Sequence, residues 1–87
     1  MSNQEAPPPI PDGLDGLGAR LSLAILHLAI SQSEFARRLG SSPWFVSDIV
    51  RGVKKPGAEF LAGIKQTFGI STDWLLIGDG TIFGGAG

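Results

Sequence analysis

The side chains best suited to binding a partner are concentrated between Gln32 and Lys55, in the middle of an 87-residue chain. An amide, hydroxyls, a carboxylate, bases and aromatic rings occur there, which suits hydrogen bonding, ion pairing and stacking. The chain has few side chains suited to acid–base or nucleophilic catalysis, because it has one histidine, no cysteine and no tyrosine. We therefore expect no enzyme, no small-molecule substrate, no metal ion and no cofactor.

A helix from Gln32 to Leu39 is predicted to carry the first of these side chains. Ser31 and Glu34 form an S-x-x-E capping box, in which each side chain can satisfy a free backbone N–H of the first helical turn. Gly40 is predicted to end this helix, because glycine adopts positive φ without a Cβ clash.

A second helix is predicted to begin at Pro43, with Ser42 as its N-cap, because proline at the first helical position loses no hydrogen bond. Helical spacing then divides the residues between two faces. The inner, apolar stripe consists of Val46, Ile49 and Val50. The outer side presents Trp44, Ser47, Asp48 and Arg51.

Two short helices joined by a tight turn match the helix-turn-helix unit, whose first helix braces a second that enters the major groove of DNA. Counted from Gln32, small Ala36 is fifth, Gly40 is ninth, and apolar Val46 and Ile49 are fifteenth and eighteenth. These are the positions of the helix crossing, the turn and the inner face of the second helix. With the segments SDIVRG, KKP and STDWLLIG, residues 17–78 resemble the lambda-type phage repressors and their wider XRE-like family.

The resemblance implies a compact, all-α, five-helix domain that binds a double-stranded DNA operator as a homodimer and regulates transcription. It also implies a cytoplasmic protein of a bacterium or a phage, and the absence of cysteine fits an intracellular setting. The DNA-contacting positions that it suggests are Gln32, Ser42, Pro43, Trp44, Phe45, Ser47, Asp48, Arg51, Lys54 and Lys55.

These side chains offer two kinds of contact. Trp44 and Phe45 can pack on thymine methyl groups, Ser47 can bond a phosphate or a base edge, and Asp48 can accept from cytosine N4. The residues better suited to phosphate are Gln32, Arg51, Lys54 and Lys55. Relatives often place glutamines at the start of the second helix, so Pro43 and Trp44 predict an unusual sequence preference. The operator sequence itself does not follow from these residues.

Charge is distributed unevenly along the chain. The net charge is −1, yet all seven bases lie within residues 17–78, where there are only four acids, so this part has a formal charge of +3. Mild local excess of positive charge is compatible with a DNA partner.

Three regions are predicted from composition and periodicity. Residues 1–13 are proline-rich and acidic and are predicted to be a disordered tail, followed by the DNA-binding domain at 14–78. Its first helix is predicted over Leu14–Leu28, and Trp74 is expected to pack on the core. Residues 79–87 are glycine-rich and are predicted to be a flexible linker or tail. The chain is interpreted either as the N-terminal part of a longer repressor or as a short regulator.

Leu23 and Leu26 form a second apolar stripe on the first helix, where relatives usually carry charged residues. Two interpretations remain open at this point. Either Ile82 and Phe83 fold back and cover the stripe, or the stripe is a surface for a second subunit or another protein.

A protein-binding module is the alternative to a DNA-binding regulator. In an antirepressor or an assembly adaptor, Trp44, Phe45, Leu23 and Leu26 would be the hydrophobic anchors. Selection of bound sequences from a random duplex pool would distinguish the two functions.

Overall fold

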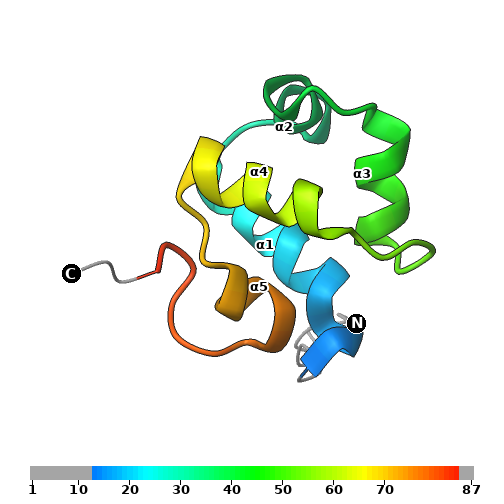
Figure 1. Cartoon of the computed structure of the whole chain (residues 1–87). Coiled ribbons are helices and arrows are strands. Elements are labelled where there is room, and N and C mark those ends of the chain that lie inside the picture. The colour runs from blue at the N-terminus through cyan, green and yellow to red at the C-terminus, as the bar shows by residue number, and fades with distance from the viewer. Residues whose placement is uncertain (1–12, 85–87) are drawn as a thin grey trace, which may run out of the picture.

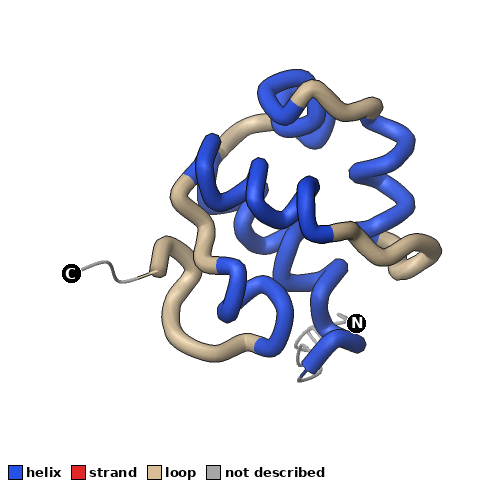
Figure 2. The backbone as a smooth tube through the Cα atoms, in the orientation of Figure 1, coloured by secondary structure: helices blue, strands red, loops and turns tan. Residues whose placement is uncertain are grey.

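Residues 13–84 are described by the computed structural model, and within them the chain forms only helices and connecting turns (Figures 1 and 2). The elements are η1 (Gly13–Gly16), α1 (Leu17–Leu28), α2 (Gln32–Leu39), α3 (Pro43–Val50), α4 (Ala58–Phe68) and α5 (Thr72–Ile77). The expected all-α domain with five α-helices is confirmed. None of the helices in this range is long and apolar enough to cross a membrane.

The caps predicted for α2 and α3 are present. Ser31 Oγ accepts a hydrogen bond from the Glu34 N–H at 3.0 Å, and Ser42 Oγ accepts one from the Phe45 N–H at 3.1 Å. Between the helices, Gly40 has a φ of 70°, as expected for a residue that ends a helix in the left-handed region. The capping box is only half used, because the Glu34 carboxylate turns toward two arginines of its own helix.

The prediction for the first helix is wrong over its first turn. Residues 13–16 form the short 3-10 helix η1, and α1 begins at Leu17. The physical reason is the glycine content of this turn, since glycine costs about 1 kcal/mol in an α-helix relative to alanine. Gly13, just before the predicted start at Leu14, has a φ of 69°, in the left-handed region, so a regular α-helix cannot extend back through it.

Arg20 is buried in the domain, a position that was not predicted from the sequence. Its side chain is only 4% exposed. Its Nε donates to the Leu75 carbonyl at 2.9 Å, and its Nη2 donates to the carbonyls of Leu76 and Gly13. Arg20 therefore ties α1 to the C-terminal carbonyls of α5 and to the start of η1. The other six bases are exposed.

The core lies where α1, α3, α4 and α5 meet, and α2 closes it from the side of α3 and α4 (Figure 1). Stacking of Phe35 on Phe68, with ring centroids 4.6 Å apart, joins α2 to the end of α4. Trp74 is 9% exposed, so its expected position in the core is confirmed. The buried apolar residues are Leu17, Leu21, Ala24, Ile25, Phe35, Ala36, Val46, Ile49, Ile64, Ile70, Trp74 and Leu75.

After α5 the chain turns back toward the beginning of that helix (Figure 1). The Ser71 N–H donates to the Ile82 carbonyl at 2.7 Å, and the Ile82 side chain packs against the core. Within the predicted linker, Ile82 thus packs on the domain while its neighbours in 79–84 are exposed, and 85–87 lie outside the described residues. So does the predicted tail, apart from Gly13.

Candidate nucleic-acid interface

The α2–α3 unit is held at a close crossing and a tight turn. Ala36, at the crossing, is completely buried, and a larger side chain there would push the helices apart. The Ser41 N–H donates to the Ala36 carbonyl at 2.9 Å, which closes the turn after α2. Val46 and Ile49 anchor α3 on the core, with 0% and 1% of their surface exposed. The outer side of α3 is thereby presented on a rigid support.

Trp44 is the most exposed large side chain on this outer side, with 80% of its surface accessible. Ser42 and Pro43 beside it are also exposed, whereas Ser47, one turn further on, is half-buried. Helical periodicity predicted that Trp44 lies on the outer face of α3, and its exposure in the structure agrees with this prediction. An indole ring in this position can offer a large apolar face and one N–H to a partner.

Phe45 has a different environment from its neighbour. It is half-buried, and its ring makes an edge-to-face contact with Phe60 of α4, with centroids 5.1 Å apart. The ammonium group of Lys54 lies 5.8 Å from the centre of the Phe45 ring, within the range of a cation–π contact. Phe45 therefore connects α3 to α4 and to the loop after α3, and only its remaining surface can contact a partner.

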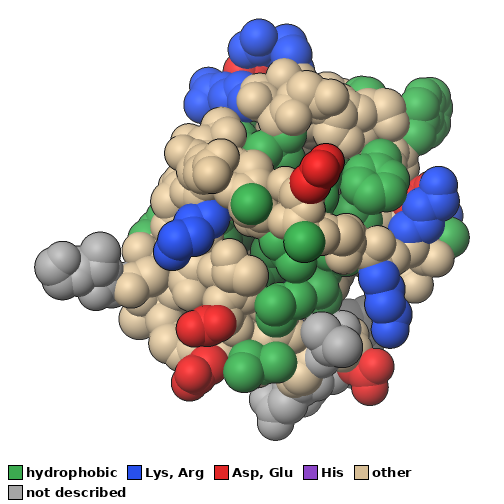
Figure 3. All heavy atoms as spheres, in the orientation of Figure 1, with side chains coloured by type: hydrophobic (Ala, Val, Ile, Leu, Met, Phe, Trp, Pro, Cys, Tyr) green, Lys and Arg blue, Asp and Glu red, His purple; other side chains and the backbone are tan. Residues whose placement is uncertain are grey.

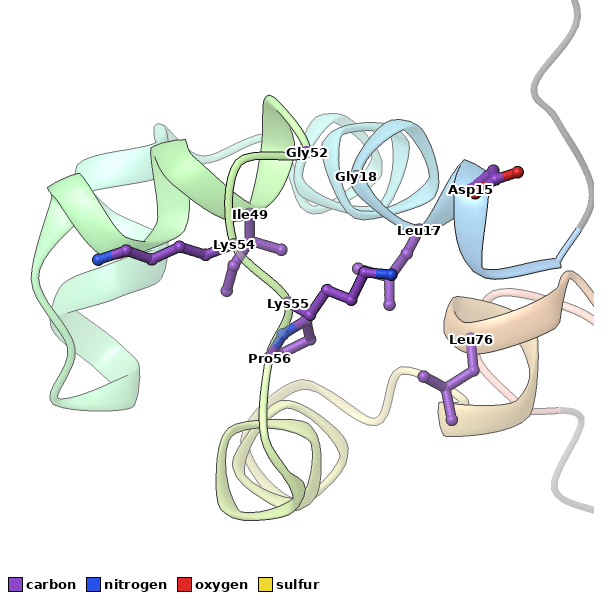
Figure 4. Close-up of a pocket in the computed structure, with 9 residues that line it drawn as sticks. All are labelled: Asp15, Leu17, Gly18, Ile49, Gly52, Lys54, Lys55, Pro56 and Leu76. Atoms are coloured by element: carbon purple, nitrogen blue, oxygen red, sulfur yellow. The ribbon is translucent and has the colours of Figure 1, made fainter.

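The basic residues after α3 differ in their partners. Asp48 on α3 is close to two of them, with Oδ1 2.7 Å from Arg51 Nη2 and Oδ2 3.6 Å from Lys54 Nζ. Within residues 13–84, Lys55 makes no hydrogen bond or ion pair. Figure 4 shows the two lysines extending in different directions, Lys54 along α3 and Lys55 toward Leu17. In the space-filling view, basic side chains are visible on the side of α3 and its loop (Figure 3).

A cavity of about 430 Å³ lies beneath this loop, between the start of α1, the end of α3 and α5 (Figure 4). Leu17, Ile49 and Leu76 make much of its wall apolar, and Lys55, which also lines it, extends toward Leu17. No cluster of three or more side chains able to bind a metal ion occurs within residues 13–84.

At the other end of the unit, Gln32 is the first residue of α2 and is half-buried. Two turns of α2 also hold an ion-pair network, in which Glu34 binds both Arg37, at 2.5 Å, and Arg38, at 2.7 Å. Hydrogen bonds from Arg37 and Arg38 lower the pKa of Glu34 to about 2, so the carboxylate is ionised at neutral pH. These arginines are exposed but already paired.

The apolar stripe of α1 divides into two different environments. Leu23 is half-buried and packs against the core, whereas Leu26 is 73% exposed. Of the two residues expected to fold back, Ile82 packs against the core but Phe83 is 46% exposed, and Leu26 stays accessible. The stripe is therefore not a continuous free surface.

Sequence comparison identifies the unit formed by these helices. A helix-turn-helix family model matches residues 22–75, which include α2 and α3. The chain belongs to this helix-turn-helix family. The chain is also similar to HTH-type transcriptional regulators of the conjugative elements R391, from Providencia rettgeri, and SXT, from Vibrio cholerae. Each is 34% identical over 71 residues, which are 82% of this chain but only 33% of the relative. This helix-turn-helix chain therefore spans about one third of the length of those regulators.

A solved structure gives the corresponding comparison in three dimensions. The P22 c2 repressor, crystallised with a synthetic operator, matches with a TM-score of 0.68 and 28% identity, over 72% of this chain and 96% of the repressor chain. The resemblance to lambda-type repressors that the sequence suggested is thereby confirmed.

Proposed function

We propose that this helix-turn-helix chain binds double-stranded operator DNA as a homodimer and represses transcription, as a phage or mobile-element repressor or its N-terminal domain. The observation that carries the proposal is the outer side of α3, where Trp44 is 80% exposed at the beginning of a helix fixed from behind by Val46 and Ile49. In helix-turn-helix proteins this side of the second helix faces base edges in the major groove. The P22 c2 repressor, which shares the fold, was crystallised with an operator.

Selection of bound sequences from a random duplex pool at moderate salt tests the proposal directly. A two-fold symmetric dimer should select a palindromic motif, with half-sites about one helical turn apart. The absence of any enriched sequence would contradict operator binding. Enrichment of a single, non-palindromic half-site would contradict the homodimer while retaining the DNA-binding function.

Trp44→Ala should weaken specific binding by about 1 to 3 kcal/mol, the usual cost of removing one good base contact. Non-specific affinity and the melting temperature should stay nearly unchanged, because the ring is mostly exposed in the free domain. Fluorescence anisotropy with selected and scrambled duplexes measures both affinities.

Leu26→Ala is the matched control for Trp44, because its side chain is similarly exposed but lies on α1, outside the α2–α3 unit. It should keep full affinity for a duplex with a single half-site. A large fall in the melting temperature of Trp44→Ala would show instead that the indole is buried. Weak DNA binding in both the wild type and Trp44→Ala, with loss of a protein partner in the variant, would favour a protein adaptor.

Replacing both Lys54 and Lys55 with alanine should weaken binding to all duplexes alike. The slope of log affinity against log salt should flatten by roughly one unit for each phosphate group that the variant no longer binds. Lys65→Ala is the control, since Lys65 is exposed in the last turn of α4, and Figure 1 shows that this end of the helix lies away from α3. A double variant that kept the wild-type salt slope would show that neither lysine contacts phosphate.

A further inference from the structure

Asp48 is the one acidic residue of α3, and it contacts two of the bases beside that helix. Its side chain is only 22% exposed, because neighbouring groups surround it. One oxygen is 2.7 Å from Arg51 and the other is 3.6 Å from Lys54. Two of the three bases in the segment after α3 therefore share one negative charge.

The backbone of Asp48 fixes the position of the loop that carries Lys54. Its carbonyl accepts hydrogen bonds from the Val53 N–H at 2.8 Å and from the Lys54 N–H at 3.2 Å. The contact of the lysine ammonium group with the Phe45 ring restrains the far end of the side chain. Lys54 is thus held at both ends near α3, whereas Lys55 makes no such contact within residues 13–84.

This arrangement changes what the two bases can contribute to binding any duplex. A phosphate must replace the carboxylate as the partner of Arg51 or Lys54, and the carboxylate itself repels phosphate. Exposed ion pairs are individually weak, so the exchange is possible but gains less than contact by a free cation. On a duplex that offers only phosphate, this loss affects the whole of the binding energy, whereas on an operator the base contacts do not depend on it.

We propose that Asp48 is a specificity-determining positioning residue, which lowers affinity for non-operator DNA by holding Arg51 and Lys54. The inference rests on the proposed function and assigns a role to a side chain whose charge is unfavourable near DNA. Affinity for random duplex is kept low by the shared carboxylate, and an operator recovers binding through contacts such as that of Trp44. Lys55 supplies the uncompensated phosphate contact.

Asp48→Asn tests the inference, because asparagine keeps the shape of the side chain and removes its charge. Affinity for a scrambled duplex should rise about tenfold, the combined effect of releasing two exposed pairs, and the salt slope should steepen by roughly one unit. Affinity for the selected operator should change less, so the ratio of operator to scrambled affinity should fall. Combining Asp48→Asn with Arg51→Ala and Lys54→Ala should abolish the gain, measured against the variant that carries only the two alanines.

Asp79→Asn is the control for charge alone, since Asp79 is exposed beyond α5 and the substitution removes the same unit of charge. It should leave the scrambled-duplex affinity unchanged. Asp48→Glu keeps the charge and should keep the wild-type salt slope. If Asp48→Asn does not fold, Asp48→Gln also removes the charge and replaces it in the same measurement.

Two results would overturn the inference, and they are distinguishable. If the wild type binds the selected operator but Asp48→Asn leaves scrambled-duplex affinity unchanged, Asp48 does not restrain the bases, and a loss confined to the operator would identify it as a base reader. If the wild-type chain binds no duplex at all, the proposed function fails, and the role of Asp48 fails with it.

Discussion

Gly18→Ala should destabilise the domain by about 2 kcal/mol or more, on the scale of overpacked cores. A Cβ atom at Gly18 would lie 2.4 Å from the Val50 carbonyl oxygen and 2.6 Å from that of Ile49. Both neighbours are backbone atoms at the end of α3, which cannot rotate away as a side chain can. The methyl group must therefore push α1 and α3 apart, and the melting temperature should fall by roughly 10 °C.

Gly63→Ala is the matched control, because Gly63 also lies inside a helix and its nearest neighbour would be the Leu39 Cδ2 atom at an ordinary 3.7 Å. Alanine should be neutral there or stabilise the domain by up to about 1 kcal/mol, through its higher helix propensity. The melting temperature should fall for Gly18→Ala and stay the same or rise for Gly63→Ala. Equal increases in melting temperature would mean that α1 and α3 do not approach closely at Gly18.

The effect of Gly18→Ala should extend to binding, because Ile49 and Val50 end the helix that presents Trp44. Among molecules that remain folded, a displaced α3 should bind the operator less tightly. Scrambled-duplex affinity should change less, since phosphate contacts by the long basic side chains tolerate small displacements better than base contacts.

Arg20→Met should destabilise the domain by about 3 kcal/mol, because a buried acceptor left without its donor costs about 1 to 3 kcal/mol and Arg20 binds several carbonyls. Methionine can fill much of the space but cannot donate to the carbonyls of Leu75, Leu76 and Gly13, which Arg20 now satisfies. Arg20→Lys should recover only part of the loss, because an ammonium group does not have the planar fork of donors. Denaturant unfolding measures these differences.

Arg37→Met is the control for Arg20, since the Arg37 side chain is 72% exposed and pairs only with Glu34 of its own helix. It should cost less than about 1 kcal/mol, as exposed pairs usually do. Amide hydrogen exchange should accelerate in α5 of Arg20→Met but not of Arg37→Met. An unchanged stability of Arg20→Met would show that apolar packing, not hydrogen bonding, holds α5 on the domain.

The helix-turn-helix itself was predictable from the sequence because its signals are local. The caps at Ser31 and Ser42 and the stop at Gly40 act within one turn of each residue, so short spacings in the chain suffice to locate α2 and α3. The two tryptophans were also distinguished from the sequence, by two different signals. Helical periodicity placed Trp44 outside its apolar stripe, and Trp74 was assigned to the core from its STDWLL context.

The position of Arg20 in the sequence does indicate that its side chain is buried. Arg20 is three residues after Leu17 and four before Ala24, so it shares the inner face of α1 with them. The sequence does not identify the acceptors of its hydrogen bonds, because the carbonyls of Leu75 and Leu76 are 55 and 56 residues further along the chain. A base on an apolar stripe predicts burial with a partner, but only the fold identifies that partner.

The bounds of α2 and α3 and the outer face of α3 were determined by the sequence through spacings of three and four residues, and the family and the all-α fold through the resemblance of residues 17–78 to lambda-type repressors. The close approach at Gly18, the bonds of Arg20 to α5 and the return of Ile82 to Ser71 were decided by tertiary structure. Each joins separate segments, and its distance depends on how helices cross. Asp48 pairs with Arg51 and Lys54, which are close to it in the sequence. These ion pairs nevertheless depend on the folded loop, because the backbone and the side-chain rotamers together determine which charged groups come into contact.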